Sequence, residues 1–566
     1  MIPDLLNADL LRSVREEILE NLHFTPKETD IYKIHQSGDL ANLDGLDDSS
    51  LARLPSLLAL RDALYSATFR QYISTVADAG PLSGKKTDMA INVYTPGCHL
   101  LCHDDVIGSR RVSYILYLTD PEHPWKAEWG GALRLYPTER MKAKDGTTAI
   151  VPSAEFSKVI PPAFNQLSFF AIQPGESFHD VEEVYKRKDG ENENDGGRMR
   201  MAISGWFHIP QEGEEGYEEG AEEKQAERSS LNQLQGKGDE FDLPQPHWKA
   251  LEPITEGSDE ELTFSGTEFD WLLRFINPTY LTPDTLEQLS ESFQTDSVIT
   301  LVDFLHPKFA DRIRAAMEKV DGGKNNNFPD SISDKANQGI ARPPHKHRFL
   351  YRQPALQNRA ESSADSAVGL LLEHFLPSEL FARWLSFVSG LQLSHVDLTM
   401  RRFRRGLDYT LATSYDQAEP QLEICLGLTP TSGWGNDEED NAQTDEDGEA
   451  VGGYEVYMAG DDDDEDDGDG DDADDRIEAS ASRSNTGAGQ RRKAKADPAI
   501  YKSSGDDEDD GILFSMPANW NNLSIVLRDA GTLRFVKYVS ESAKGDRWDV
   551  TGSFTVIPGE DEDEET

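Results

Sequence analysis

Cysteine is scarce in this sequence of 566 residues, which contains only three. So few cannot form a disulfide framework, which argues for a reducing compartment. Long apolar runs are also missing, since no segment approaches the roughly 18 residues of a membrane span. The N-terminus is amphipathic and carries acidic residues, without the apolar core and cleavage site of a signal peptide. We therefore expect a soluble, intracellular protein that does not associate with a membrane.

Basic charge is the second shortage. The 55 lysines and arginines stand against 105 aspartates and glutamates, which leaves a net charge of −50. A protein that coats nucleic acid needs a basic face, so we expect no direct binding of nucleic acid. Such a chain could attract a basic protein partner, although acidic charge also serves solubility alone.

The length exceeds what one compact core usually holds, so at least two domains are expected. We predict an N-terminal domain over 1–210, whose short β-like runs and turns over 88–210 indicate a β-sandwich or jelly roll. An acidic stretch without periodicity, 211–239, is predicted to be a linker. A second domain follows over 240–566, with helical patterns first and β-like runs from 395 to 557.

Helical spacing of apolar residues is clearest over 56–79 in the first domain. In the second domain it predicts helices over 267–276, 283–294, 308–319 and 366–390. Two polar insertions, about 436–450 and 459–511, cannot bury a core and are predicted to be disordered. The basic stretch 489–495 reads either as a nuclear import signal or as a solvated patch.

The second half of the chain repeats motifs of the first in the same order. Residues 165–178 resemble 521–534, residues 200–207 resemble 547–554, and 129–136 resemble 451–458 more loosely. Three ordered matches predict two copies of one β-fold. The copies differ at three polar positions: matching their glycines places Ala412, Ser414 and Phe535 opposite His103, Asp105 and His179. A purely structural residue would be expected in both copies, so the difference indicates chemistry in the first.

Two of these residues, His103 and Asp105, are spaced so that an extended chain projects both side chains from one face. His179 begins a later predicted strand. Two imidazoles and one carboxylate bind one face of an octahedral metal and leave the other open, which is the arrangement of non-haem iron(II) oxygenases. A zinc site built from Cys98, Cys102, His99 and His103 is the alternative. In an extended segment the two cysteines face away from His103, so buried cysteines are the better interpretation.

A carboxylate-binding residue is expected close to this set. The Arg200 guanidinium can bind the distal carboxylate of 2-oxoglutarate in a bidentate manner. Arg198 is two positions away and strand alternation puts both on one face, but the repeat favours Arg200, which matches Arg547. Tyr117 could donate a phenolic hydrogen bond to the same carboxylate, or be a core aromatic.

Taken in order, the runs 103–120, 129–137, 165–184 and 200–208 resemble the 2-oxoglutarate-dependent ribosomal prolyl hydroxylases of eukaryotes, including fungal prolyl 3,4-dihydroxylases. The resemblance implies a mainly β protein with flanking helices. It would contain two tandem double-stranded β-helix domains of the jelly-roll or cupin-like type. The N-terminal copy would be catalytic, and the C-terminal copy inactive, serving recognition or regulation.

The resemblance also implies the roles of single residues: iron ligands His103, Asp105 and His179, a 2-oxoglutarate arginine Arg200, and a tyrosine Tyr117. Implied cofactors are Fe(II), 2-oxoglutarate and O2, with ascorbate as reductant. The implied substrate is a prolyl residue of a small-subunit ribosomal protein, hydroxylated at C3 and in some fungi at C4. Translation termination or transcription factors are implied partners, and the nucleus and cytoplasm the location. The alternative function is an oxygen-responsive binding regulator that acts through the C-terminal domain.

The chain departs from the family pattern at two places. The polar insertion 186–197 is expected to be a surface hairpin loop that leaves the site intact. Ala202 stands where many such oxygenases have a serine, two residues after the arginine. This removes one hydroxyl donor to the co-substrate carboxylate.

Overall fold

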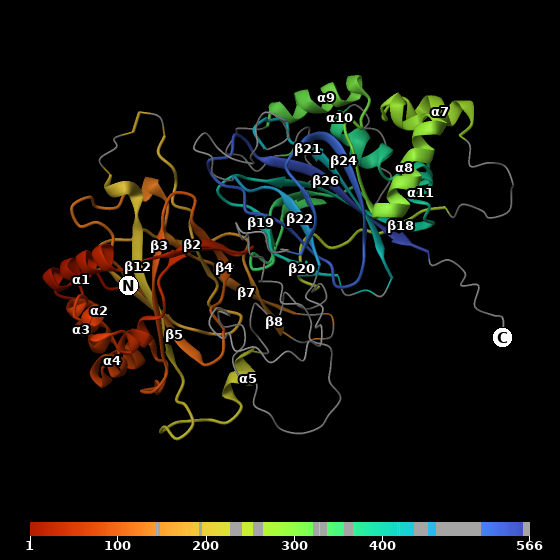
Figure 1. Cartoon of the computed structure of the whole chain (residues 1–566). Helices are drawn as coiled ribbons and strands as arrows, with labels where there is room; N and C mark the ends of the chain where they lie inside the picture. Colours follow the sequence, from red (N-terminus) through yellow and green to blue (C-terminus); the bar gives the residue numbers. More distant parts are fainter. Residues whose placement is uncertain are drawn as a thin grey trace. The chain divides into compact units, whose positions relative to one another are not determined.

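A computed structural model describes the chain over residues 1–142, 144, 146, 148–188, 190–191, 195–226, 240–252, 264–320, 328, 337–355, 366–415, 417, 419–434, 451–459 and 511–557. The predicted disordered insertions 436–450 and, apart from its two ends, 459–511 lie outside these residues, as do 227–239 of the predicted linker. The described residues form two compact units (Figure 1). The first lies within Met1–Gly236 and includes Pro343–Lys346; the second lies within Lys237–Arg342, His347–Gly460 and Gly511–Thr566.

The first unit begins with helices. They are α1 (Ala8–Asn21), η1 (Leu40–Gly45), α2 (Asp48–Leu51), α3 (Pro55–Leu64) and α4 (Ala67–Ala77), followed later by η2 (Ala127–Trp129), η3 (Gly196–Arg198) and α5 (Ala221–Ala226). The single helix predicted over 56–79 is wrong, because the chain forms two helices there. Ser66 accepts a hydrogen bond from the backbone N–H of Phe69 and so begins a new helix. Helix α5 lies inside the stretch expected to be a linker.

The strands of the first unit follow the predicted β-like runs. They are β1 (Thr25–Glu28), β2 (Tyr32–Gln36), β3 (Thr87–Tyr94), β4 (His99–His103), β5 (Arg110–Tyr117), β6 (Leu133–Leu135), β7 (Thr138–Lys142), β8 (Thr148–Pro152), β9 (Lys158–Ile160), β10 (Leu167–Ala171), β11 (His179–Val181) and β12 (Arg200–His208). The main sheet has the order β10-β5-β12-β3-β2-β4-β11-β6-β9. The run β10-β5-β12-β3 and the run β4-β11-β6-β9 are the two halves of a double-stranded β-helix, as expected.

Helices α1, α3 and α4 lie on one side of strands β3, β5 and β12 (Figure 1). Ile91, Leu116 and Ile203 on these strands belong to the same buried cluster as Leu57 and Leu60 of α3. Each such side chain stabilises the fold by about 1.5–3 kcal/mol through burial. Because side chains alternate along a strand, the residues between them face the interior of the barrel, where the site is found.

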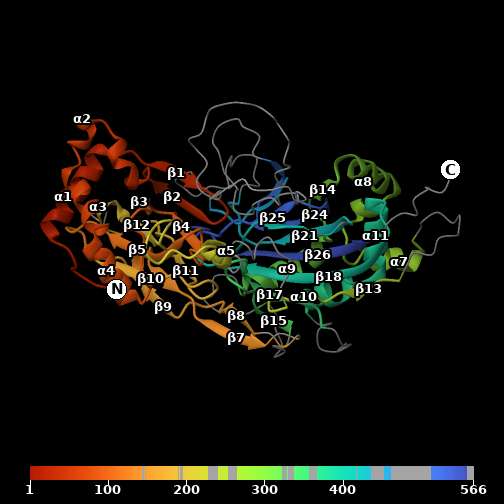
Figure 2. The ribbon, with the colours of Figure 1, turned by 90° about the horizontal axis from the view of Figure 1, so that it is seen from below.

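Helices of the second unit are α7 (Gly266–Leu272), η4 (Pro278–Leu281), α8 (Pro283–Asp296), α9 (Pro307–Glu318), α10 (Ala367–Gly369), η6 (Leu370–Phe375) and α11 (Glu379–Ser389). The predictions over 267–276, 283–294 and 308–319 are confirmed within a few residues. The one over 366–390 is interrupted before α11, which begins where Ser378 accepts a hydrogen bond from the N–H of Phe381. Figure 2 shows α11 next to strands β21 and β26.

Strands of the second unit are β13 (Lys249–Ala250), β14 (Val298–Leu301), β15 (Gln338–Ile340), β16 (His347–Arg348), β17 (Leu350–Arg352), β18 (Leu393–Phe403), β19 (Tyr409–Thr410), β20 (Thr413–Ser414), β21 (Gln421–Leu428), β22 (Glu455–Met458), β23 (Ile512–Met516), β24 (Trp520–Arg528), β25 (Leu533–Val536) and β26 (Arg547–Val556). The run β24-β21-β26-β18 and the sheet β20-β25-β22-β23 repeat the two halves of the first barrel strand for strand.

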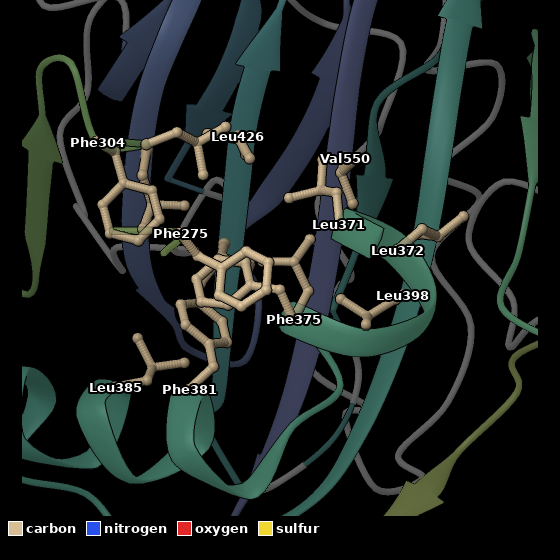
Figure 3. Close-up of a cluster of buried hydrophobic side chains, with 14 of the residues drawn as sticks. Phe275, Phe304, Leu371, Leu372, Phe375, Phe381, Leu385, Leu398, Leu426 and Val550 are labelled. Atoms are coloured by element: carbon tan, nitrogen blue, oxygen red, sulfur yellow. The ribbon is translucent and has the colours of Figure 1, made fainter. Parts of the chain in front are cut away.

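The core of the second unit joins its helices to its major sheet (Figure 3). Phe275 and Phe375 stack with ring centroids 4.8 Å apart. Leu398, Leu426 and Val550 contribute the strand side of this core, from β18, β21 and β26. Within the described residues, no helix combines the length and the apolar character needed to cross a membrane.

Paired glycines show that the sequence repeat is a structural repeat. Gly130 and Gly131 have φ angles of 70° and 71°, and Gly452 and Gly453 have 71° and 72°. A Cβ atom at Gly130 would lie 2.0 Å from the carbonyl oxygen of Glu183, and one at Gly452 would lie 1.8 Å from that of Tyr538. Both barrels therefore need glycine at the same turn, for the same two reasons.

Candidate metal centre

Three predicted ligands converge in the first barrel. His103 ends β4, Asp105 follows it, and His179 begins β11, directly opposite His103 in the sheet register. The Nε2 atom of His103 lies 3.2 Å from Oδ1 of Asp105, and Nε2 of His179 lies 3.5 Å from Oδ2. One ligand atom from each residue lies within 4.8 Å of the others. In the described part of the chain this is the one group of histidine, cysteine, aspartate or glutamate side chains that fits a metal ion.

Asp105 reaches this position through a backbone turn and not through strand alternation. Strand β4 ends at His103, and Asp105 has a φ of 60°, in the left-handed region. Aspartate tolerates this conformation better than most residues, although it still costs free energy. The expectation that an extended segment aims both side chains to one face is therefore replaced by a kink that turns the carboxylate back toward His103.

Backbone carbonyl groups fix both imidazoles. Nδ1 of His103 lies 2.8 Å from the carbonyl oxygen of Leu101, and Nδ1 of His179 lies 2.9 Å from that of Ser177. With the proton on Nδ1, each ring donates to that carbonyl and presents an unprotonated Nε2 to a metal. This is the usual orientation of metal-binding histidines. The rings lie 4.3 Å apart, and Phe170 packs edge-on against His179.

The charges of the triad favour an ionised carboxylate between two imidazoles. Burial opposes ionisation of Asp105, but the charges of His179 and His103 outweigh it and hold the pKa of its carboxyl well below the usual range. Burial, together with the neighbouring charge of His103, lowers the pKa of His179 to about 4. Burial opposes protonation of His103, but the hydrogen bond to Asp105 and the charge of Asp105 raise its pKa. Asp105 and His179 thus favour the forms that bind a metal, a carboxylate and a neutral imidazole, whereas a metal ion would take the place of a proton on His103.

The alternative zinc site does not form. Cys98 packs with Ile34, Tyr94, Val181 and Val184, whereas Cys102 packs with Tyr136 and Phe178 in a different apolar cluster. Neither thiol belongs to a group of converging ligands in the described residues. The interpretation as buried cysteines agrees with this packing, and none of the three cysteines forms a disulfide.

The two candidate arginines are clearly separated by the structure. Arg198 precedes β12 with a φ of 49° and binds Asp195 and Glu191 in the loop before it. Arg200 lies in the barrel, where its Nε donates to the carbonyl oxygen of Gly131 at 2.7 Å. Its guanidinium carbon lies 5.1 Å from the centre of the Tyr117 ring.

The insertion over 186–197 is more than a surface hairpin, since its residue Asp195 is buried and accepts hydrogen bonds from Arg187 and Arg198. The loop therefore holds Arg198 away from the barrel. Within it, residues 189 and 192–194 lie outside the described part of the chain.

Arg200 and Tyr117 form a cradle for a carboxylate. The Tyr117 hydroxyl and Nη2 of Arg200 are both buried and have no hydrogen-bond partner among the described residues. Buried polar groups are nearly always paired, so two unmatched donors side by side indicate a ligand. Ile115, Leu133, Ile160 and Ala202 pack around Tyr117 as apolar walls. A dicarboxylate with a methylene chain would match these donors with its carboxylate and the apolar side chains with its methylene groups.

Sequence reasoning missed the pair formed by Arg110 and Trp206. The Arg110 guanidinium carbon lies 3.6 Å from the centre of the Trp206 ring and the side chain also pairs with Asp88. Trp206 is six residues beyond Arg200 on β12, so alternation places both on the barrel's inner face. This contact depends on the register between β5 and β12, which no local motif encodes.

The second barrel lacks the triad, but its counterparts differ by one residue from those expected. In the sheet register His179 lies opposite His103 and Leu135, whereas Arg534 lies opposite Thr413 and Tyr457. Once the paired glycines are superposed, Leu135 corresponds to Tyr457. The counterparts of His179 and His103 are therefore Arg534 and Thr413, and not Phe535 and Ala412.

A difference in turn length explains the shift at His179. Before β11 the turn closes with a hydrogen bond from the N–H of Ser177 to the carbonyl of Gln173, four residues earlier. Before β25 it closes from Thr532 to Asp529, three residues earlier. Matching Gly175 with Gly531 along the sequence therefore misplaces everything that follows by one residue.

Acidic side chains occupy the second barrel where the first has its cradle. Arg547, the counterpart of Arg200, pairs with Asp549 at 2.9 Å and Glu455 at 3.4 Å. Asp549 corresponds to Ala202, and Glu455 to Leu133. Gly427 stands in the place of Tyr117. In the second barrel Arg547 is thus paired with carboxylates of the chain itself. Its counterpart in the first barrel, Arg200, has an unmatched donor.

Comparison with protein families gives two matches. Residues 267–564 match the family described as the C-terminal region of oxoglutarate and iron-dependent oxygenase degradation proteins. Residues 89–208 match the 2OG-Fe(II) oxygenase superfamily. The second range contains all three converging ligands together with Tyr117 and Arg200.

Curated relatives are similar over most of the chain. The prolyl 3,4-dihydroxylase OGFOD1 of Ostreococcus tauri is 31% identical over 560 residues, which cover 97% of this chain and 92% of the relative. The prolyl 3-hydroxylase OGFOD1 of Xenopus laevis is 29% identical, covering 69% of this chain and 58% of the relative. A solved structure, a prolyl-4-hydroxylase of Pseudomonas putida, is 22% identical over 37% of this chain and 90% of its own, with a TM-score of 0.24.

Proposed function

Because this chain belongs to the family of 2-oxoglutarate- and iron-dependent oxygenases that includes the Ostreococcus tauri relative, we propose that it hydroxylates a prolyl residue of a small-subunit ribosomal protein. We propose C3 of the proline ring as the position of hydroxylation, with C4 as a second position. The proposed consequence is a change in translation termination or accuracy. The similarity to a prolyl 3,4-dihydroxylase along almost the whole of both chains carries this proposal. Ribosomal proteins are basic, and the net charge of −50 favours encounter with a basic substrate.

Residues of the first barrel suit the cofactors of this chemistry. When bound, iron, O2 and 2-oxoglutarate supply the oxidising power that places a hydroxyl group on an unactivated carbon. His103, Asp105 and His179 would hold the metal from one face. Tyr117 and Arg200 would hold the far carboxylate of 2-oxoglutarate through the donors that are unmatched. We propose ascorbate as the reductant.

The chain's own part is to orient these groups and exclude water. Asp105 and His179 are buried, and Phe170 closes one side of the His179 ring. Backbone carbonyls set the histidine rings before any metal arrives. Such preorganisation lowers the free energy needed to assemble the site, and rigid strands are enough to provide it.

Mass spectrometry of small-subunit ribosomal proteins tests the proposal. Purified full-length protein with iron, 2-oxoglutarate and ascorbate should add the mass of one oxygen atom, or two, to a proline-containing peptide. His103→Ala should abolish the product, whereas Thr413→Ala, the matched change in the second barrel, should not. Full hydroxylation by His103→Ala would refute the metal assignment. Succinate release without a modified ribosomal peptide would refute the substrate.

A second candidate function is a binding regulator that acts on a transcription or translation factor through the second barrel. The observation in favour is that this barrel keeps the fold while its arginine is already neutralised by Asp549 and Glu455. The two functions are separable. A phenotype of gene loss that His103→Ala protein rescues fully would favour the regulator, and one that it fails to rescue would favour the enzyme.

We also propose a location in both nucleus and cytoplasm. The basic stretch 489–495, which lies outside the described residues, is the candidate import signal. Changing its two arginines and two lysines to alanine should remove a fluorescently tagged protein from the nucleus if it acts as a signal. Unchanged fluorescence in the nucleus would contradict that role.

A further inference from the structure

A third buried donor lies close to Tyr117 and Arg200. The Ser168 hydroxyl, on β10, is buried and has no hydrogen-bond partner in the described part of the chain, as is true of the Tyr117 hydroxyl and Nη2 of Arg200. The exposed fractions of the three residues are 4%, 0% and 1%. A buried hydroxyl left unmatched costs free energy, and a cluster of three calls for an explanation.

The sheet register puts the three groups on one face. Ser168 lies opposite Ile115 in the pairing of β10 with β5, and Tyr117 is two residues further along β5 on the same face. Tyr117 in turn lies opposite Ala202 on β12, two residues from Arg200. The three donors therefore come from three adjacent strands, with Tyr117 in the middle.

The pKa of the Tyr117 phenol is influenced by both Ser168 and Arg200. Burial raises the pKa of its phenol, while the charge of Arg200 and the polar contacts with Ser168 and Arg200 act to lower it. Ser168 and Arg200 therefore both lie near the phenol oxygen, as the register of the three strands also indicates.

The second barrel provides an internal comparison. Ser524, the counterpart of Ser168, lies opposite Cys425 in the same way that Ser168 lies opposite Ile115. Its hydroxyl donates to Sδ of Met516 at 2.9 Å and lies 3.0 Å from the hydroxyl of Thr300. In the second barrel, where carboxylates of the chain pair with Arg547, the serine is paired; in the first barrel the Ser168 hydroxyl has no partner among the described residues.

Ala202 supplies no hydrogen-bond donor at its position beside Tyr117. Its side chain is a methyl group, buried in the same apolar cluster as Ile115 and Tyr117, and cannot donate. A carboxylate has about four lone-pair sites, more than Tyr117 and Arg200 satisfy. A hydroxyl on a neighbouring strand can supply the missing bond.

We propose that Ser168 is a co-substrate-binding residue, whose hydroxyl donates a third hydrogen bond to the far carboxylate of 2-oxoglutarate. It acts in place of a hydroxyl at position 202. The inference rests on the 2-oxoglutarate dependence of the proposed function and not on the identity of the hydroxylated protein. It predicts that the site prefers a 2-oxo acid whose far end is a carboxylate over a 2-oxo acid of equal length whose far end is a methyl group.

Calorimetric titration of the full chain tests this, with Mn(II) in place of iron and without oxygen. Ser168→Ala should weaken 2-oxoglutarate binding about tenfold, since a hydrogen bond to a charged group is lost. Binding of 2-oxopentanoate, which has a methyl group in place of the far carboxylate, should not change. Ser168→Thr, which keeps the hydroxyl, should bind 2-oxoglutarate within about threefold of the wild type.

Two further variants sharpen the result. Ala202→Ser in the Ser168→Ala background should restore most of the lost affinity, and Ser524→Ala, the matched change in the second barrel, should have no effect on binding. Equal weakening of both ligands by Ser168→Ala would make Ser168 a structural residue and overturn the proposal. Unchanged 2-oxoglutarate affinity would overturn it too. Absence of 2-oxoglutarate binding in the wild type would overturn it together with the co-substrate assignment, whereas failure to modify a ribosomal protein would leave these titrations unaffected.

Discussion

Arg200 is a buried cation with only part of its hydrogen bonding satisfied. Its Nε is bound to Gly131, while Nη2 has no partner among the described residues. A charge in such a position is costly unless a counter-charge arrives. The free energy that the unmatched Nη2 costs the fold would be recovered when an anion binds, which links ligand affinity to protein stability.

Arg200→Lys should test the planar, two-pronged character of this contact. Lysine keeps the charge but is a point donor and cannot bind a carboxylate in a bidentate manner. We expect 2-oxoglutarate affinity to fall by on the order of 2 kcal/mol, roughly 30-fold, with metal affinity unchanged. Titration with 2-oxoglutarate and with Mn(II) separates the two. Arg198→Lys is the matched control, and an equal loss there would contradict the assignment to Arg200.

His208 should make the first unit sensitive to mild acid. Burial, with the charges of Lys86 and Arg110 nearby, lowers the pKa of His208 to about 3; Asp88, 3.8 Å away, does not offset this. The unfolded chain binds a proton near pH 6.5, the folded chain only near pH 3. Stability from the neutral ring is therefore complete above about pH 6.5 and is lost as the pH falls below it.

Between pH 7.5 and 5.5 this loss should amount to about 1 kcal/mol. Thermal unfolding across this range measures it, on the transition that metal and 2-oxoglutarate shift. His208→Asn, which does not titrate, should reduce the pH dependence of that transition by the same amount. An identical pH profile in the variant would show that His208 is not the group responsible.

Some residues of the site could be predicted because their chemistry is local. His103 and Asp105 form a recognisable pair, and the absence of their counterparts from the second copy strengthened the prediction. Ser168 could not be predicted, since an unmatched buried hydroxyl is a property of three strands together. Arg198 and Arg200 have the same residue type and spacing, and only the loop ion pairs with Asp195 and Glu191 separate them.

At the scale of elements, the junction of β6 and β11 fixes the distance between the ligand strand and the cradle. Gly130 lies there with a φ of 70°, so close to the Glu183 carbonyl that no side chain fits. Strand β11 carries His179, and the residue after Gly130 receives the Nε hydrogen bond of Arg200. One turn therefore positions the metal ligand and the carboxylate donor together.

Gly130→Ala should consequently damage both binding functions. Its Cβ would meet backbone, so β6 and β11 must separate, and we expect a loss of several kcal/mol in stability with weakened metal binding. Gly175→Ala is a matched control: its φ is 75°, yet nothing lies within 4 Å of the added carbon. It should cost only about 1 kcal/mol. Similar unfolding temperatures for the two variants would show that the close approach is unimportant.

The elements were predicted well where apolar periodicity dominates and poorly where a side-chain cap intervenes. Strand runs such as 112–118 are rich in apolar residues, are buried on both faces of the sheet and were found in place. The helix over 56–79 failed because Ser66 competes for the backbone N–H of Phe69, which restarts the chain in a new direction. The one-residue error in matching His179 arose from turn length, which the sequence does not display.

At the scale of the whole molecule, the chain contains two barrels whose interiors are charged in different ways. The first has buried donors on Tyr117 and Arg200 that are unmatched among the described residues. The second has a network in which Arg401 and Arg534, besides Arg547, pair with Glu455. The charges of Arg534 and Arg401 overcome burial and lower the pKa of Glu455 below its ordinary value.

Calorimetry of the full chain should therefore show ligand effects on one unit alone. Mn(II) with 2-oxoglutarate at about 100 times its dissociation constant should stabilise the first unit by about 2.7 kcal/mol. Among the described residues of the second unit no group of side chains fits a metal ion, so its unfolding should not respond. Asp549→Ala should lower the second transition by about 3–5 kcal/mol, since Arg547 and Arg401 lose a buried partner. A shift of both transitions by metal would contradict this division.

Because Glu455 and Asp549 provide the counter-charge of the second barrel, the two barrels should respond differently to nutrient supply. In the first barrel the negative charge that completes the interior arrives from metabolism, so its stability varies with the supply of iron and of a central intermediate of carbon metabolism. In the second barrel the same charge is encoded in the gene and is present at every concentration. Starvation for iron would thus weaken one half of the chain and spare the other, so a cell short of metal would keep the second barrel folded.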